Sequence, residues 1–192
     1  MKIWNLTAIA MALCLSACAN AKTVVLSSGD RYRSDGLLTE EYRLGAGDKL
    51  RVIVYNEVQL SGEYVVDSQG KLSLPLVGDL DVQGKTSIEV ARQAEGLFRS
   101  RNYLLNPRVS IEVSAFRPFF VVGEVHKPGQ YPYVAGLTVW NAIATAEGLT
   151  PRAKKTVVYI RRFGEAAELP YRLTPDLRVW PGDTLRINER FF

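Results

Sequence analysis

The stretch LGAGDKLRV at residues 44–52 has a near copy close to the other end of the chain, VWPGDTLRI at residues 179–187. In each copy a Gly-Asp pair precedes a short run of alternating apolar and polar residues, which is typical of a β-strand. Each copy therefore predicts a tight turn that leads into a strand. Two explanations of the repeat remain open: a relationship between the two regions, or convergence on a favourable turn.

Working outward from the first copy, residues 39–116 are predicted to form one folded domain. Residues 86–102 predict its helix, because Ile88, Ala91, Ala94 and Leu97 or Phe98 recur at helical spacing and Thr86 with Glu89 forms a capping box. Runs rich in β-branched and aromatic residues predict the strands, the first three of them adjacent, at 50–55, 62–66, 72–74 and 108–113. The polar cluster at residues 67–70 predicts a turn between two of these strands.

Residues 117–192, which include the second copy, are predicted to form another domain of the same kind. Lys127-Pro128-Gly129 lies between two apolar runs and predicts a hairpin-type turn. Thr138 is the expected N-cap of a short helix that ends at Gly148, with Trp140 in its buried stripe. Further strands are expected at 119–125, 130–134, 156–160 and 184–188. The predicted fold class is therefore α+β, with two small β-rich domains that have one helix each.

The N-terminus has the organisation of a signal peptide at residues 1–17. A single Lys2 precedes an apolar run of roughly 13 residues, which is too short to span a bilayer core of ~30 Å. Leu15-Ser-Ala-Cys18 resembles the bacterial lipobox, in which the cysteine is acylated and becomes the first mature residue. We therefore expect lipid attachment at Cys18, a lipidated tether at residues 18–38 and export from the cytoplasm. The alternative is an ordinary signal peptidase site, in which Cys18 is an incidental thiol.

Composition excludes several classes of function. The chain has 192 residues, of which 47% are hydrophobic and 23% charged, and a net charge of +4 is too small to predict a nucleic-acid-binding surface. With two cysteines and one histidine the chain lacks ligands for a typical zinc site, so neither a metal nor a cofactor is expected. No catalytic residues are assigned: His126 is expected in an exposed turn, and Asp79 and Asp81 on a solvated strand face. We expect a protein that is not an enzyme.

Charge is distributed unevenly between the two predicted domains. Residues 39–116 contain 9 basic and 11 acidic residues, whereas residues 117–192 contain 11 basic and 7 acidic residues. Arg152, Lys154, Lys155, Arg161 and Arg162 are candidates for binding an anionic polymer or an acidic partner, and a solvated basic edge is the alternative. Trp180, in a predicted turn, is a candidate platform for stacking against a sugar.

Several motifs together carry a resemblance to a known family. Residues 42–52, GEYVVDSQG at 62–70 and LPLVG at 74–78 resemble the polysaccharide biosynthesis/export domain of outer-membrane exporters of the Wza type. VGEVHKPGQY at 122–131 and the second Gly-Asp stretch resemble the SLBB module, a β-grasp-like domain. The resemblance covers nearly all of the chain from about Tyr42, in the order expected behind a lipobox.

This resemblance implies a ring-forming periplasmic lipoprotein of capsular polysaccharide or exopolysaccharide export, working with an inner-membrane polysaccharide co-polymerase. Ala19 follows Cys18 where the family of enterobacterial lipoproteins has aspartate for inner-membrane retention, which favours an outer-membrane location with the domains on the periplasmic face. Larger members carry a C-terminal membrane helix, and we expect this protein to be a short form that lacks it. We therefore expect a separate outer-membrane channel, a β-barrel, as a further partner. The alternatives are a periplasmic polysaccharide-binding lipoprotein without a conduit role and, less favoured, a hydrolase.

Overall fold

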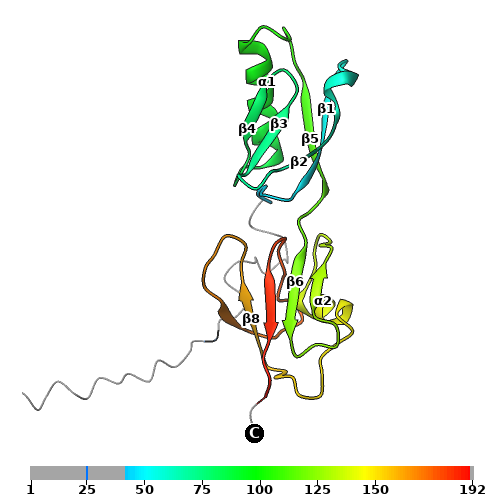
Figure 1. The fold of residues 1–192 in the computed structure, drawn as a ribbon, viewed down its shortest axis with the longest axis vertical. Coiled ribbons are helices and arrows are strands. Elements are labelled where there is room, and N and C mark those ends of the chain that lie inside the picture. Colours follow the sequence, from blue (N-terminus) through cyan, green and yellow to red (C-terminus); the bar gives the residue numbers. More distant parts are fainter. Residues whose placement is uncertain (1–24, 26–41, 191–192) are drawn as a thin grey trace, which may run out of the picture.

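The computed structural model describes residue 25 and residues 42–190 (Figure 1). The expected signal peptide, Cys18 and the tether lie outside these residues, apart from Val25, which belongs to no helix or strand. The elements are, in order, β1 (Lys49–Val54), the 3-10 helix η2 (Val58–Leu60), β2 (Gly62–Val65), β3 (Lys71–Leu74), β4 (Gly78–Asp81), α1 (Ser87–Ser100), β5 (Val109–Ala115), β6 (Phe119–Gly123), β7 (Gly129–Tyr131), α2 (Val139–Thr145), β8 (Val157–Arg161), β9 (Leu169–Arg172) and β10 (Thr184–Ile187).

These elements form two lobes, each around an apolar core of its own (Figure 1). The core of the first lobe is drawn from residues 44–111 and that of the second from residues 119–187, and no residue belongs to both. The predicted α+β class with two small β-rich units is confirmed. The expected domain boundary at residues 116 and 117 falls between β5 and β6 and stays a prediction.

The first lobe is organised around β1, the central strand of the sheet β2-β1-β5. Its side chains alternate between the two faces, so that Leu50, Val52 and Val54 are buried while the residues between them face solvent. β1 runs antiparallel to both neighbours, with Val52 opposite Gly62 on β2 and Ile111 on β5. Because β1 lies between them, β2 and β5 are the two edges of this sheet.

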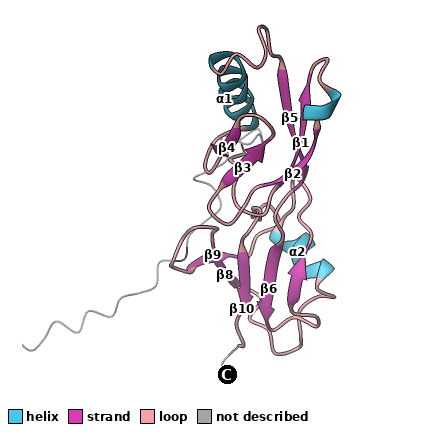
Figure 2. Cartoon of the chain, turned by 45° about the horizontal axis from the view of Figure 1, so that its top comes forward, coloured by secondary structure: helices cyan, strands magenta, loops and turns pink. Residues whose placement is uncertain are grey.

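Strands β3 and β4 form a separate two-stranded sheet, so residues 72–74 do not extend the sheet that contains β1 and β2. The predicted turn at residues 67–70 redirects the chain between β2 and β3. The side chain of Asp67 accepts hydrogen bonds from the backbone N–H groups of Gln69 and Lys71, both at 2.8 Å, and Gly70 has φ +74°. Together with α1, the β3–β4 pair lies on one side of the larger sheet (Figure 2).

Helix α1 begins at the predicted capping box. The N–H of Glu89 donates to the hydroxyl of Thr86 at 3.2 Å, and a carboxylate oxygen of Glu89 accepts from the N–H of Thr86 at 2.9 Å. Its buried residues are Val90, Ala91, Ala94 and Phe98. The expectation that Ile88 is buried is wrong, since its side chain is 53% exposed. Ile88 and Val90 are two positions apart, which corresponds to a rotation of about 200° around the helix axis, so their side chains cannot both face the core.

In the second lobe the strand order is β7-β6-β10-β8-β9. The central pair β6 and β10 is parallel, and the other neighbours are antiparallel. Parallel strands need a crossover, and α2 lies in the long connection between them. Strand β9 was not anticipated from the sequence.

Helix α2 follows Thr138, whose hydroxyl accepts from the N–H of Asn141 at 3.3 Å, as expected for an N-cap. Its buried face is Val139, Ala142 and Ile143. The prediction of a buried Trp140 is wrong, because this side chain is 39% exposed. Position 140 is rotated by about 100° from Val139, away from the stripe that continues at i+3 and i+4.

Candidate functional site

The two Gly-Asp stretches have the same local structure. In the first, the Asp48 carboxylate accepts a hydrogen bond from the N–H of Gly45 at 2.8 Å. In the second, the Asp183 carboxylate accepts one from the N–H of Trp180 at 2.7 Å. The glycines before the two aspartates have φ +90° and +85°, a conformation that favours glycine. The repeated sequence therefore specifies a repeated turn.

Each turn is also joined to a neighbouring chain segment in the same way. The N–H of Val66 donates to the carbonyl of Asp48 at 2.9 Å, and the N–H of Phe120 donates to that of Asp183 at 2.8 Å. The backbone N–H groups of Gly47 and Gly182, the glycines that precede the two aspartates, donate to the carbonyls of Val66 and Pro118, respectively. The turns thus fix the start of β1 and of β10 against their neighbours.

Both aspartates are fully buried, and each is paired with an arginine. Asp48 pairs with Arg117 at 3.5 Å, and Asp183 pairs with Arg162. Both arginine side chains are only 11% exposed. Burying a carboxylate is unfavourable unless a cation and hydrogen bonds compensate it, so each turn depends on its arginine.

Arg117 joins the two lobes. Its backbone N–H donates to Asp48 at 2.9 Å, while its side-chain Nε donates to the carbonyl of Pro181 in the second turn at 3.0 Å. Its guanidinium also lies 3.9 Å from the ring centre of Phe163. One side chain therefore contacts the first Gly-Asp turn in one lobe and the second Gly-Asp turn in the other.

Aromatic rings extend this junction. The Phe116 ring lies between those of Tyr42 and Tyr133, with centroid distances of 4.9 and 5.4 Å and edge-to-face geometry. The Tyr42 hydroxyl donates to Asp48 at 2.7 Å, and burial together with this bond raises the pKa of Tyr42. Burial raises the pKa of Asp183 to about 6, opposed by the positive charge of Arg162.

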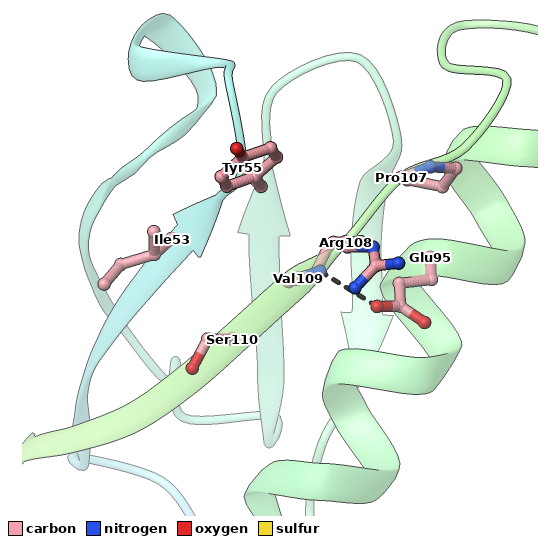
Figure 3. Close-up of a pocket in the computed structure, with 7 residues that line it drawn as sticks. All are labelled: Ile53, Tyr55, Glu95, Pro107, Arg108, Val109 and Ser110. Atoms are coloured by element: carbon pink, nitrogen blue, oxygen red, sulfur yellow. Dashed lines mark hydrogen bonds between the residues drawn. The ribbon is translucent and has the colours of Figure 1, made fainter.

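A surface hollow lies elsewhere, between α1 and the start of β5 (Figure 3). It is open and has a volume of about 990 Å³. The side chains of Tyr55, Ile53 and Pro107 provide its apolar lining. Glu95 accepts a hydrogen bond from the N–H of Val109 at 2.9 Å, drawn in Figure 3, which satisfies one backbone donor beside this hollow. The combination of an exposed aromatic ring, apolar side chains and charged groups suits contact with another molecule better than chemistry.

The structure does not bring the five predicted basic residues together. Arg152, Lys154 and Lys155 precede β8, whereas Arg161 and Arg162 lie at its far end. A five-residue strand is about 16 Å long, so the two groups are separate. Arg152 is paired with Glu189 and Arg162 with Asp183.

Lys154, Lys155 and Arg161 are exposed and form no ion pair with a described residue. Trp180 is half-buried in the second Gly-Asp turn. Binding of a polymer by any of these residues stays a prediction.

The other residues considered from the sequence are placed as follows. His126 is exposed in the turn after β6, and its backbone N–H donates to Gly148. Asp79 and Asp81 are exposed on β4, where Asp79 accepts from the hydroxyl of Ser73 at 2.5 Å.

Sequence reasoning missed Arg117. The repeated Gly-Asp pair was the available signal for the aspartates, but nothing in the sequence marks the arginines that pair with them.

Among residues 42–190, no helix is both long and apolar enough to cross a membrane.

Comparisons with known proteins match both lobes. The model of the polysaccharide biosynthesis/export protein family matches residues 38–114, and the SLBB domain model matches residues 118–169. The exopolysaccharide production protein ExoF of Rhizobium meliloti is 38% identical over 153 residues, which cover 72% of this chain and 34% of ExoF. The EPS I polysaccharide export outer membrane protein EpsA of Ralstonia nicotianae is 31% identical over 185 residues, covering 78% of this chain and 48% of EpsA.

The chain thus spans about a third of one of these curated relatives and about half of the other. The two family models adjoin in the order that the sequence motifs predicted; the first covers the core of the first lobe and the second covers the core residues of the second lobe up to Ile160. The resemblance inferred from those motifs is confirmed: this chain belongs to the polysaccharide biosynthesis/export protein family and carries an SLBB domain behind its export domain.

Proposed function

We propose that this protein is a lipid-anchored component of a conduit that exports a capsular polysaccharide or exopolysaccharide. It is held at the periplasmic face of the outer membrane through Cys18, and copies of it form a ring. The ring works with an inner-membrane polysaccharide co-polymerase and with a separate outer-membrane channel. The polymer passes through, so the protein has no need of a catalytic centre.

The observation that carries this proposal is the order of three features in one chain. A lipobox-like Leu15-Ser-Ala-Cys18 precedes the export domain, and the SLBB domain follows that domain directly. The relatives lend support through their names, which describe one as an exopolysaccharide production protein and the other as a polysaccharide export outer membrane protein.

The experiment is complementation of a deletion strain. We expect Cys18→Ser to prevent acylation, to release the protein from the outer-membrane fraction and to reduce polymer in the medium. Cys14→Ser is the matched control, because Cys14 leaves with the signal peptide and its loss changes neither location nor export. Full export by an unacylated Cys18→Ser protein would contradict the proposal.

The second candidate is a periplasmic polysaccharide-binding lipoprotein without a conduit role. Exposed cations on the second lobe favour this candidate, since Lys154, Lys155 and Arg161 form no ion pair with a described residue, although Arg161 donates a hydrogen bond to the hydroxyl of Thr184 at 3.2 Å. This candidate predicts a monomer whose deletion leaves export intact. Sedimentation of the detergent-solubilised protein, together with polymer measurement in the deletion strain, separates the two.

Contact with an anionic polymer is tested by reversing the charges of Lys154, Lys155 and Arg161 to glutamate. Arg162 is left unchanged, because its reversal would place a second carboxylate against the buried Asp183 and disrupt the fold. We expect the triple variant to fold and to export less of an acidic polymer. Unchanged export would assign these residues to a solvated basic edge.

A further inference from the structure

The hollow between α1 and β5 contains an aromatic ring that is exposed although its backbone is held in place. Tyr55 follows β1 directly and is 68% exposed. Its N–H donates to the carbonyl of Arg108 at 2.9 Å, and the N–H of Glu57 donates to the carbonyl of Val54 at 3.0 Å. Asn56, between them, has φ +62°, in the left-handed region that asparagine tolerates. This tight turn therefore presents the Tyr55 ring to solvent from a fixed backbone.

Polar side chains lie across the hollow from this ring (Figure 3). Glu95 comes from α1, Arg108 directly precedes β5, and Ser110 lies on β5. The N–H of Val109 donates to Oε1 of Glu95, whereas Oε2 forms no hydrogen bond with a described residue. The Arg108 guanidinium and the Ser110 hydroxyl are exposed and also have no partner among residues 42–190. The hollow thus offers a donor, an acceptor and a hydroxyl to a ligand.

This set of groups matches a sugar ring better than an ion or a purely apolar ligand. A pyranose has an apolar C–H face that packs on an aromatic ring, and its hydroxyls both donate and accept hydrogen bonds. Arg108 can only donate and an ionised Glu95 can only accept, so a ligand rich in hydroxyls satisfies both. Glu95 would repel an anion, and Arg108 would repel a cation.

The space available suits several sugar units. The hollow has a volume of about 990 Å³, at the upper end of the range of about 300–1,000 Å³ typical of ligand pockets. A second hollow of about 310 Å³ adjoins it, since Glu95, Val109 and Ser110 line both. We call the two joined hollows the groove. Its length along α1 and β5 favours a chain over a single small molecule.

We propose that the groove binds a short stretch of polysaccharide, with one pyranose ring stacked on Tyr55 and its hydroxyls bonded to Arg108, Glu95 and Ser110. This inference rests on the proposed function, because the ligand is the exported polymer. It places the polymer site in the first lobe, whereas all candidate polymer-binding residues chosen from the sequence lie in the second.

Binding is measured by isothermal titration calorimetry on the full-length protein in detergent. The probe is the extracellular polysaccharide of the wild-type strain, cut into short oligosaccharides. We expect Tyr55→Ala and Arg108→Ala each to weaken binding about tenfold, because the first removes the stacking surface and the second a charged hydrogen-bond donor. Tyr55→Phe keeps the ring and should bind within about twofold of the wild type.

The matched controls are Tyr103→Ala and Arg99→Ala. Both residues are exposed in the first lobe, and neither lines the groove. We expect these variants to bind like the wild type. Thermal unfolding of the Tyr55 and Arg108 variants at the wild-type temperature shows that a loss of binding is not a loss of folding.

A wild type that does not bind the oligosaccharides overturns this inference, as do Tyr55 and Arg108 variants that bind like the wild type; the Cys18 complementation still decides the proposed function. Variants that bind normally but no longer export would assign the groove to a protein partner and would also overturn it. If binding depends on Tyr55 and Arg108 while deletion of the protein leaves export intact, the groove stands and the conduit role falls.

Discussion

The guanidinium of Arg117 lies 3.5 Å from the carboxylate of Asp48, although 69 residues separate the two in the chain. Arg117 directly precedes the second lobe, whereas Asp48 directly precedes the first strand of the first lobe. The ion pair therefore couples the two lobes at the place where the chain passes from one to the other.

Replacing Arg117 with alanine should lower the free energy of unfolding by about 3–5 kcal/mol, because the fully buried Asp48 loses its cation. Chemical denaturation measures this loss. Arg92→Ala is the control, since Arg92 is exposed and forms no ion pair with a described residue, and its effect should stay within about 0.5 kcal/mol. Equal effects of the two substitutions would contradict the assignment of Arg117.

The pH dependence of stability should report on Asp183, whose pKa burial raises to about 6. The unfolded chain has a carboxyl pKa of about 3.9, so between these values the native state binds this proton more tightly. Asp183 therefore makes an increasingly favourable contribution to the unfolding free energy as the pH falls from about 6 to about 4. Above that window its contribution is least favourable.

The measurement is the difference in unfolding free energy between the wild type and Asp183→Asn across pH 4 to 7. We expect this difference to shift in favour of the wild type as the pH falls. A difference that moves the other way would show that the Arg162 ion pair outweighs the effect of burial.

Gly123→Ala should be strongly destabilising. Gly123 ends β6 with φ +88°, and an added Cβ would lie 2.0 Å from the carbonyl oxygen of Ile187. Backbone strain and this clash together should lower the free energy of unfolding by about 3 kcal/mol or more. Gly129→Ala is the control, because no atom lies within 4 Å of the added Cβ; there, urea denaturation should show a change below about 1 kcal/mol.

Thr86→Ala should reduce stability by about 1 kcal/mol, because it removes the acceptor for the N–H of Glu89 at the start of α1. Ser87→Ala, one residue later, makes a useful comparison: the Ser87 side chain has no hydrogen bond with a described residue. Its effect should remain within about 0.5 kcal/mol. Similar losses for both variants would mean that the capping box adds little.

The sequence predicted most local elements because their signals are local. Thr86 and Glu89 lie three residues apart and bond to each other, and the alternation in β1 and the turn at residues 67–70 each involve a few adjacent positions. The family motifs likewise lie in short stretches. The burial of Ile88 and Trp140 was predicted wrongly because apolar character alone does not say which of two competing helix faces meets the sheet.

By itself, then, the sequence determined the turns, most of the strands, the two helices and the order of the two domains, since each depends on neighbouring residues. Only the tertiary structure decided that Arg162 is a structural partner of Asp183 rather than part of a basic patch, and that Arg117 joins two turns far apart in the chain. A buried carboxylate requires a cation, but which arginine supplies it depends on how distant segments pack.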